Sequence, residues 1–113
     1  MTAAFDETIH APHRLRICAF LDATASAEFS AIRDMLGVAD SVVSKHVKVL
    51  QAAGYVSLDK PTGRGGRVRT WLSLTPAGRR AFAGHVRALR ELVETGGHQE
   101  PPVRPLLRGF ELR

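Results

Sequence analysis

The spacing of hydrophobic and polar positions outlines a small domain with several short elements. Residues 12–25 are mostly apolar and open on a proline, which suits the first turn of a helix because that turn needs no backbone N–H there. A second short helix is predicted over residues 31–36, with Ser30 as its N-cap and Gly37 as its stop. Between the two helices, residues 27–29 fit a single β-bridge.

A third helix has clear signals at both ends, since Asp40 or Ser41 caps its start and Gly54 ends it. Its buried stripe repeats at helical spacing and consists of Val43, Val47 and Leu50. A second face is small, polar and basic, and it consists of Ser41, Ser44, Lys45 and Lys48. Such a face can approach DNA without bulky obstruction and can donate to phosphates and base edges.

The next segment alternates with period two and predicts a two-stranded hairpin. Residues 55–60 form the first strand, residues 61–66 form a turn rich in glycine, and residues 67–74 form the returning strand. Thr75 followed by Pro76 is typical of an N-cap and a first helical position.

The last predicted helix covers residues 76–94 and carries apolar side chains along one side. Because a small domain would leave these apolar side chains partly exposed to solvent, we expect this side of the helix to pair two copies of the chain. We therefore divide the chain into an N-terminal arm (residues 1–9), one domain (residues 10–95) whose last helix dimerises (about residues 76–95), and a flexible C-terminal tail (residues 96–113).

Charge is concentrated in the middle of the sequence. The chain has 113 residues, a formal net charge of +5 and an isoelectric point near 10.3. Residues 40–80 hold eight Lys and Arg against two Asp, so this segment carries +6 and the rest carries −1. A basic surface confined to one segment is the electrostatic footprint of a nucleic-acid binder, although a solvated basic face has the same composition.

Other function classes find little support. No nucleophile–base pair, carboxylate dyad or phosphate-binding loop is present, so we expect no enzyme, no catalytic residue and no cofactor. Cys18, the only cysteine, falls on the apolar stripe of the first helix and is expected to be buried. His10 and His13 without further ligands make a weak metal site, so no metal is expected. No apolar run reaches bilayer length and no secretory signal is present, which predicts a cytoplasmic, nucleoid-associated protein without membrane contact.

The order helix, helix, helix, hairpin, helix resembles a winged helix-turn-helix, a mainly α fold with a small β-hairpin (α+β). Residues 37–56, with Ser-Lys-His-Val-Lys-Val-Leu followed by Ala-Gly-Tyr-Val, resemble the turn and recognition helix of MarR-like and ArsR-like bacterial regulators. Residues 65–71, Gly-Gly-Arg-Val-Arg-Thr-Trp, are similar to the wing. Residues 74–79, Leu-Thr-Pro-Ala-Gly-Arg, are similar to the start of the helix that follows the wing.

The resemblance implies a short single-domain transcriptional regulator that binds double-stranded DNA as a homodimer. The implied recognition-helix contacts are Ser41, Val42, Ser44, Lys45, His46 and Lys48. The implied wing contacts are Arg64, Gly65, Arg67 and Arg69. The apolar side of the last helix supplies the expected dimer interface, namely Phe82, His85, Val86, Leu89, Leu92 and Val93.

Two other functions are compatible with the same fold. A winged helix also serves as a protein-interaction module, and fold alone does not decide between these roles. A ligand-responsive regulator would bind a small-molecule effector between the last helix and the first, and the sequence does not identify such an effector. The +6 segment favours DNA, because a scaffold has no reason to gather Lys and Arg on both the third helix and the hairpin.

Overall fold

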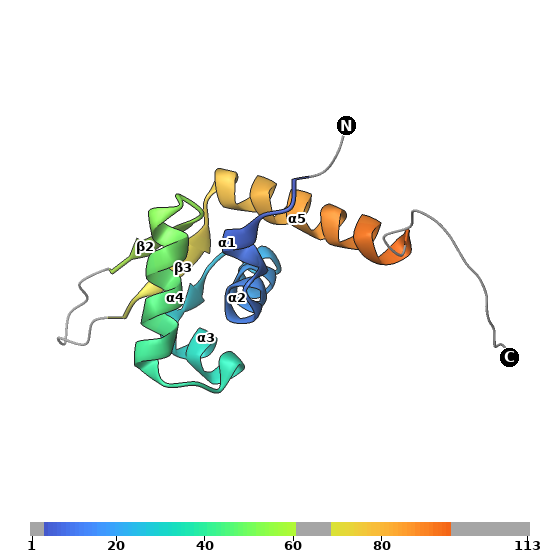
Figure 1. Ribbon diagram of the computed structural model, residues 1–113. Helices are drawn as coiled ribbons and strands as arrows, with labels where there is room; N and C mark the ends of the chain where they lie inside the picture. Colours follow the sequence, from blue (N-terminus) through green and yellow to red (C-terminus); the bar gives the residue numbers. More distant parts are fainter. Residues whose placement is uncertain (1–3, 61–68, 96–113) are drawn as a thin grey trace, which may run out of the picture.

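The computed structural model describes residues 4–60 and 69–95 of the chain, arranged as helices around a small sheet (Figure 1). Its elements in chain order are α1 (Glu7–His10), α2 (Pro12–Asp22), β1 (Ala27–Glu28), α3 (Phe29–Leu36), α4 (Asp40–Ala52), β2 (Val56–Asp59), β3 (Trp71–Leu74) and α5 (Pro76–Glu94). This is the winged helix-turn-helix that the sequence predicted, with the short helix α1 added and with the bridge expected over residues 27–29 present as strand β1.

The bridge expected over residues 27–29 forms a third strand in the sheet. All neighbours are antiparallel in the order β1-β3-β2, and β1 pairs with β3 through Ala27 opposite Leu72 and Glu28 opposite Trp71. The sequence predicted this bridge but not its partner strand, because β1 is only two residues long and its pairing joins distant parts of the chain. Within the described residues β3 starts at Trp71, later than predicted, and β2 is shorter than predicted by one residue at each end.

One face of the sheet packs against the helices and closes the core. The buried residues of the strands are Ala27, Val56, Leu72 and Leu74. Side chains of α1 to α4 complete the same cluster, among them Ile9, Ile17, Leu21, Ile32, Val43 and Leu50, all fully buried. The predicted stripe of α4 is thus confirmed as its core face, which turns the remaining faces of α4 outward.

α3 and α4 form the helix-turn-helix around a left-handed glycine. Gly37 has φ +69° and its N–H bonds the carbonyl of Arg33, which ends α3 as predicted. The predicted Ser30 cap is wrong, because α3 begins at Phe29 and Glu28 occupies the N-cap position without a side-chain bond. The N–H of Phe29 instead donates to the carbonyl of Thr70 at 2.8 Å, so the preceding strand pairing starts the helix.

The start of α5 is locked onto the end of α4. The side chain of Thr75 caps α5 by accepting from the N–H of Gly78 at 2.9 Å, and it donates to the carbonyl of Gly54 at 2.6 Å. Gly78 is buried directly against the backbone carbonyl of Tyr55, where a Cβ would overlap it. Arg79 donates to the carbonyls of Asp22 and Thr24, so the Leu-Thr-Pro-Ala-Gly-Arg motif is a structural joint.

The N-terminal arm contains the one helix that the sequence did not predict. Its described part includes the short helix α1, which Asp6 caps by accepting from the N–H of Ile9 at 3.1 Å. α1 packs against α2, α4 and α5, and Ile9 is fully buried. After it, α2 starts at Pro12 as predicted but ends at Asp22, three residues before the predicted limit.

Candidate nucleic-acid interface

The outward side of α4 carries the polar and basic residues that the sequence assigned to DNA. Ser41, Lys45 and Lys48 are exposed, while Val42 and Ser44 are half-buried. Among the described residues neither lysine has an ion-pair partner within 4.0 Å. Their ammonium groups are thus available to phosphates, in agreement with the chemistry expected of this face.

A groove joins this face of α4 to the base of the hairpin. It has a volume of about 330 Å³, and residues from both sides line it, including Ser44, Lys48 and Gln51 from α4 and Lys60 and Thr70 from the hairpin. Two lysines and three neutral donors therefore border one concave surface. Gln51 was not among the residues predicted from the sequence, although it continues the helical spacing of Ser44 and Lys48 by three further positions.

His46 is turned from the exposed face toward α2. Its Nδ1 accepts from Arg14 at 3.1 Å, and its ring meets that of His13 edge-on with centroids 5.3 Å apart. Burial lowers the pKa of His46, and the charge of Arg14, His13 and Lys45 lowers it further. His46 is therefore neutral at pH 7 and its contacts hold α4 against α2.

Arg14 is a second residue that was not predicted from the sequence. Its Nε donates to the carbonyl of Thr8, so one guanidinium ties the end of α1 to His46 of α4. No local pattern marks such a residue, because its two partners come from separate elements. Across the turn between α3 and α4, Arg33 lies 3.3 Å from the carboxylate of Asp40. Because both side chains are exposed, this ion pair contributes little to stability.

The predicted wing residues lie mostly beyond the part of the chain that the structure describes. Arg64, Gly65 and Arg67 fall within the undescribed residues 61–68. Arg69 is exposed, and its Nε lies 3.6 Å from the carboxylate of Glu28 on β1. Because this pair is largely open to solvent, it leaves the guanidinium free to exchange partners.

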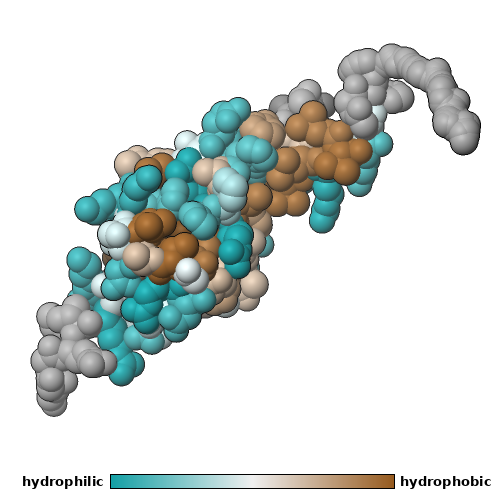
Figure 2. All heavy atoms as spheres, turned by 60° about the horizontal axis from the view of Figure 1, so that its bottom comes forward, coloured by the Kyte–Doolittle hydropathy of each residue, from teal (hydrophilic) through white to brown (hydrophobic). Residues whose placement is uncertain are grey.

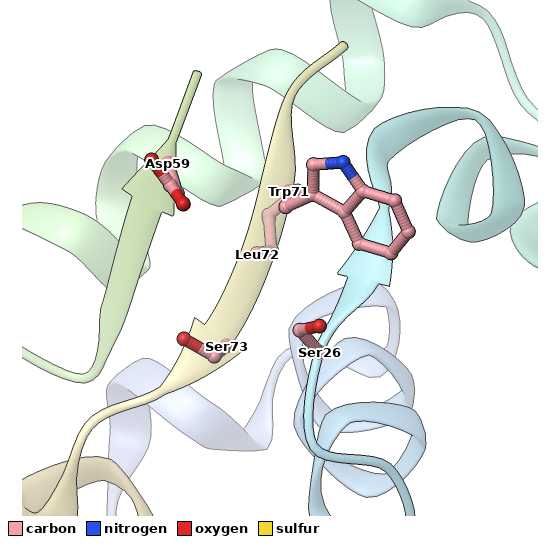
Figure 3. A pocket seen from close by; sticks show the side chains of 5 residues that line it. All are labelled: Ser26, Asp59, Trp71, Leu72 and Ser73. Atoms are coloured by element: carbon pink, nitrogen blue, oxygen red, sulfur yellow. The ribbon is translucent and has the colours of Figure 1, made fainter. Parts of the chain in front are cut away.

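The outer face of the sheet forms a second shallow hollow beside the wing. It has a volume of about 370 Å³ and is lined by Ser26, Asp59, Trp71, Leu72 and Ser73 (Figure 3). The indole of Trp71 extends from β3 toward β1 and remains half-exposed. Asp59 is the cross-strand partner of Trp71, so its carboxylate lies on the same face.

Cys18 behaves as the sequence predicted. The thiol is fully buried on α2, and burial, with a smaller contribution from the charge of Asp6, raises its pKa to about 12. At neutral pH it is held as an unreactive thiol. Within residues 4–60 and 69–95, no group of three or more His, Cys, Asp or Glu side chains could hold a metal ion.

The side of α5 assigned to dimerisation is exposed toward its far end. Phe82, Val86 and Leu89 are half-buried, whereas Leu92 is 54% and Val93 76% exposed. Figure 2 shows an apolar patch on the outer half of this helix. His85 differs from the others, because it is completely enclosed by its own chain and bonded to Asp6 and His10, so we leave it out of the interface.

A solvent-exposed basic helix, a helix-turn-helix and a hairpin beside it define a DNA-binding winged helix. The family model described as a winged helix DNA-binding domain matches residues 13–93. The chain therefore belongs to the winged-helix DNA-binding family, and it is a DNA-binding regulator and not an enzyme.

Three known proteins are similar to this chain. The chain is 30% identical over 79 residues to the uncharacterized protein MJ0432 of Methanocaldococcus jannaschii, covering 70% of this chain and 85% of that protein. A transcriptional regulator homologue from Pyrococcus horikoshii OT3 superposes with a TM-score of 0.72 at 26% identity, over 79% of this chain and 87% of its own. The heme sensor PefR from Streptococcus agalactiae shares the fold at 20% identity, with a TM-score of 0.66 over 84% and 64% of the two chains.

No helix among the described residues is long and apolar enough to cross a bilayer.

Proposed function

We propose that the protein is a sequence-specific transcriptional regulator that binds a pseudo-palindromic operator as a homodimer. The observation that carries this proposal is the pair of exposed lysines on α4, of which Lys48 lines the same groove as Lys60 at the hairpin base. In this arrangement α4 lies in the major groove, with Lys45 and Lys48 on phosphates and Ser41 and Ser44 against phosphates or base edges. Val42 contacts a thymine methyl group.

The hairpin contacts the flanking backbone or minor groove in the same proposal. Arg69 reaches the DNA by exchanging its exposed contact with Glu28 for a phosphate, and Arg64 and Arg67, which precede it in the sequence, supply two further cations. The glycine at position 65 allows the backbone to approach closely.

Selection of bound sequences from a random duplex library tests the proposed operator. We expect two inverted half-sites about one helical turn, roughly 10 bp, apart, because a two-fold dimer presents two copies of α4 to one side of the duplex. The same selection with Ser44→Ala should recover the same spacing with a changed base preference inside each half-site. Enrichment of single, non-inverted sites would contradict the dimeric arrangement.

The dimer has its own test on α5. Replacing both Leu92 and Val93 by glutamate should give a monomer of 12.3 kDa in sedimentation at micromolar concentration, where we expect the natural chain to sediment as a dimer. Both side chains are already exposed in the protomer, so charge there leaves its core intact while placing unpaired carboxylates in the interface. The matched control is Ala83→Glu, an exposed position on the opposite side of α5 from Leu92. Equal sedimentation of the double variant and the natural chain would remove α5 as the interface.

A further inference from the structure

A buried polar cluster fastens the N-terminal arm to α5. The N–H of Asp6 donates to Nδ1 of His85 at 2.9 Å, and Nε2 of His85 lies 3.2 Å from Nδ1 of His10. His85 is fully buried, and the ring of Phe5 packs against both imidazoles with centroids 4.6 and 4.7 Å away. The cluster thus joins residues that are 79 positions apart in the chain.

The donors and acceptors in this cluster determine where its protons are. A backbone N–H can only donate, so Nδ1 of His85 carries no proton and a neutral His85 carries its proton on Nε2. That proton is donated to Nδ1 of His10, so this nitrogen must also be unprotonated. A further proton on either ring, at the nitrogen that now accepts, would place two donors face to face inside the protein.

Other ionisable groups face the cluster from each neighbouring element. Asp6 accepts from the hydroxyl of Tyr55 at 2.6 Å, and the thiol of Cys18 on α2 lies near the same carboxylate. Burial lowers the pKa of His85 and the nearby His10 lowers it further, while Asp6 and Glu7 oppose this shift. The first two effects exceed the attraction of the carboxylates, so His85 is held neutral at pH 7.

We propose that Asp6, His10 and His85 form a proton-sensitive clasp, which holds the arm and α1 on α5 at neutral pH and opens on acidification. α1 also packs against α4, and the carbonyl of Thr8 binds the Arg14 guanidinium that holds His46. Opening the clasp therefore withdraws support from α4. This last consequence rests on α4 being the DNA-binding helix, whereas the clasp itself does not.

The sign of the pH effect follows from linkage. The unfolded chain takes up the His85 proton at its ordinary pKa of about 6.5, and the folded protein resists it until lower pH. The stabilisation is complete above about pH 6.5 and declines as pH falls below it. One proton changes the unfolding equilibrium constant by at most about tenfold per pH unit.

Thermal and denaturant unfolding of the full chain between pH 7.5 and 5 tests the clasp. Against His85→Gln, whose amide can accept from Asp6 and donate to His10 without titrating, the natural chain should lose stability more steeply, by up to about tenfold per pH unit in the unfolding constant. Tyr55→Phe serves as the matched control, since it removes one bond of Asp6 but no histidine proton, and it should keep the steep slope. Parallel slopes for the natural chain and His85→Gln would overturn the clasp.

A measurement on the natural chain makes the test independent of how well the variants fold. Histidine ring signals followed by NMR should show His85 titrating below 6.5, with the backbone amide of Asp6 moving at the same midpoint. An Asp6 amide that stays unchanged while His85 takes up its proton would overturn the proposal.

The consequence for DNA binding has a separate test in gel shifts. The DNA affinity of the natural chain should fall on acidification, and that of His85→Gln should fall less. Added histidine charge alone would instead raise the affinity of both proteins.

Discussion

Replacing Lys45 and Lys48 together by alanine should weaken binding to every duplex by roughly 50-fold near 0.1 M salt. Each phosphate that a protein neutralises contributes about 0.9 to the slope of log affinity against log salt, so two lost contacts flatten this slope by roughly 2. Both side chains are exposed and outside the core, so the fold should be unaffected. Salt-titrated gel shifts on a specific and a random duplex measure the effect.

The control for this variant removes the same charge elsewhere. Arg87 and Arg90 are exposed on α5, and changing both to alanine also lowers the net charge by two. If the charge of α4 acts locally, this control should keep nearly the natural affinity and slope. Equal losses in the two double variants would mean that only total charge matters, and would remove α4 from the proposed interface.

Gly78→Ala should destabilise the protein by about 3 kcal/mol, the largest effect we expect from a single methyl group. A Cβ at this position overlaps the backbone carbonyl of Tyr55, which cannot rotate away as a side chain would. To relieve the overlap, α5 must move from the end of α4, which strains the bonds of Thr75 to Gly54 and Tyr55. Chemical denaturation of the purified variant measures the loss.

The matched control is Gly84→Ala on the same helix. A Cβ there meets only Ala4, at ordinary contact distances of 3.8 and 3.9 Å. Because alanine favours a helix interior over glycine, this variant should be more stable than the natural chain by about 0.5–1 kcal/mol. A Gly78→Ala variant as stable as Gly84→Ala would show that α5 can move away from the Tyr55 carbonyl at little cost in stability.

Features encoded within a few residues were predictable. The end of α4 follows from Gly54, whose positive φ of +81° favours glycine. The predicted Asp40 or Ser41 cap is wrong, because α4 already begins at Asp40 and Ala39 occupies the N-cap position without a side-chain bond. The bounds of α5 also agree with the predicted helix over 76–94, because an N-cap, a proline and a long apolar stripe all lie within one segment. For the same reason, helical spacing alone was enough to place Lys45 and Lys48 on an outward face of α4.

Features that depend on distant partners were not predictable. β1 is too short to indicate which strand it pairs with, and α3 begins at Phe29 because the carbonyl of Thr70, more than 40 positions later in the sequence, accepts its N–H. His85 has the spacing of an interface residue, yet Asp6 and His10 enclose it from the other end of the chain. In each case the deciding contact is non-local, and a pattern read along one segment carries no signal of it.

The joint at the start of α5 has a geometrical consequence for reading DNA. A helix of 19 residues is about 28 Å long, and here one end is fixed to the DNA-binding body while the other bears the most exposed apolar side chains. In the proposed dimer, any change in the direction of α5 is therefore a rotation about its fixed end at Gly78. A tilt of about 10° at Gly78 moves the C-terminal end of α5 by about 5 Å, more than one base-pair step. The packing of Gly78 on Tyr55 would then set the distance between the two half-sites that the dimer binds. Variants at this joint should therefore alter the preferred operator spacing.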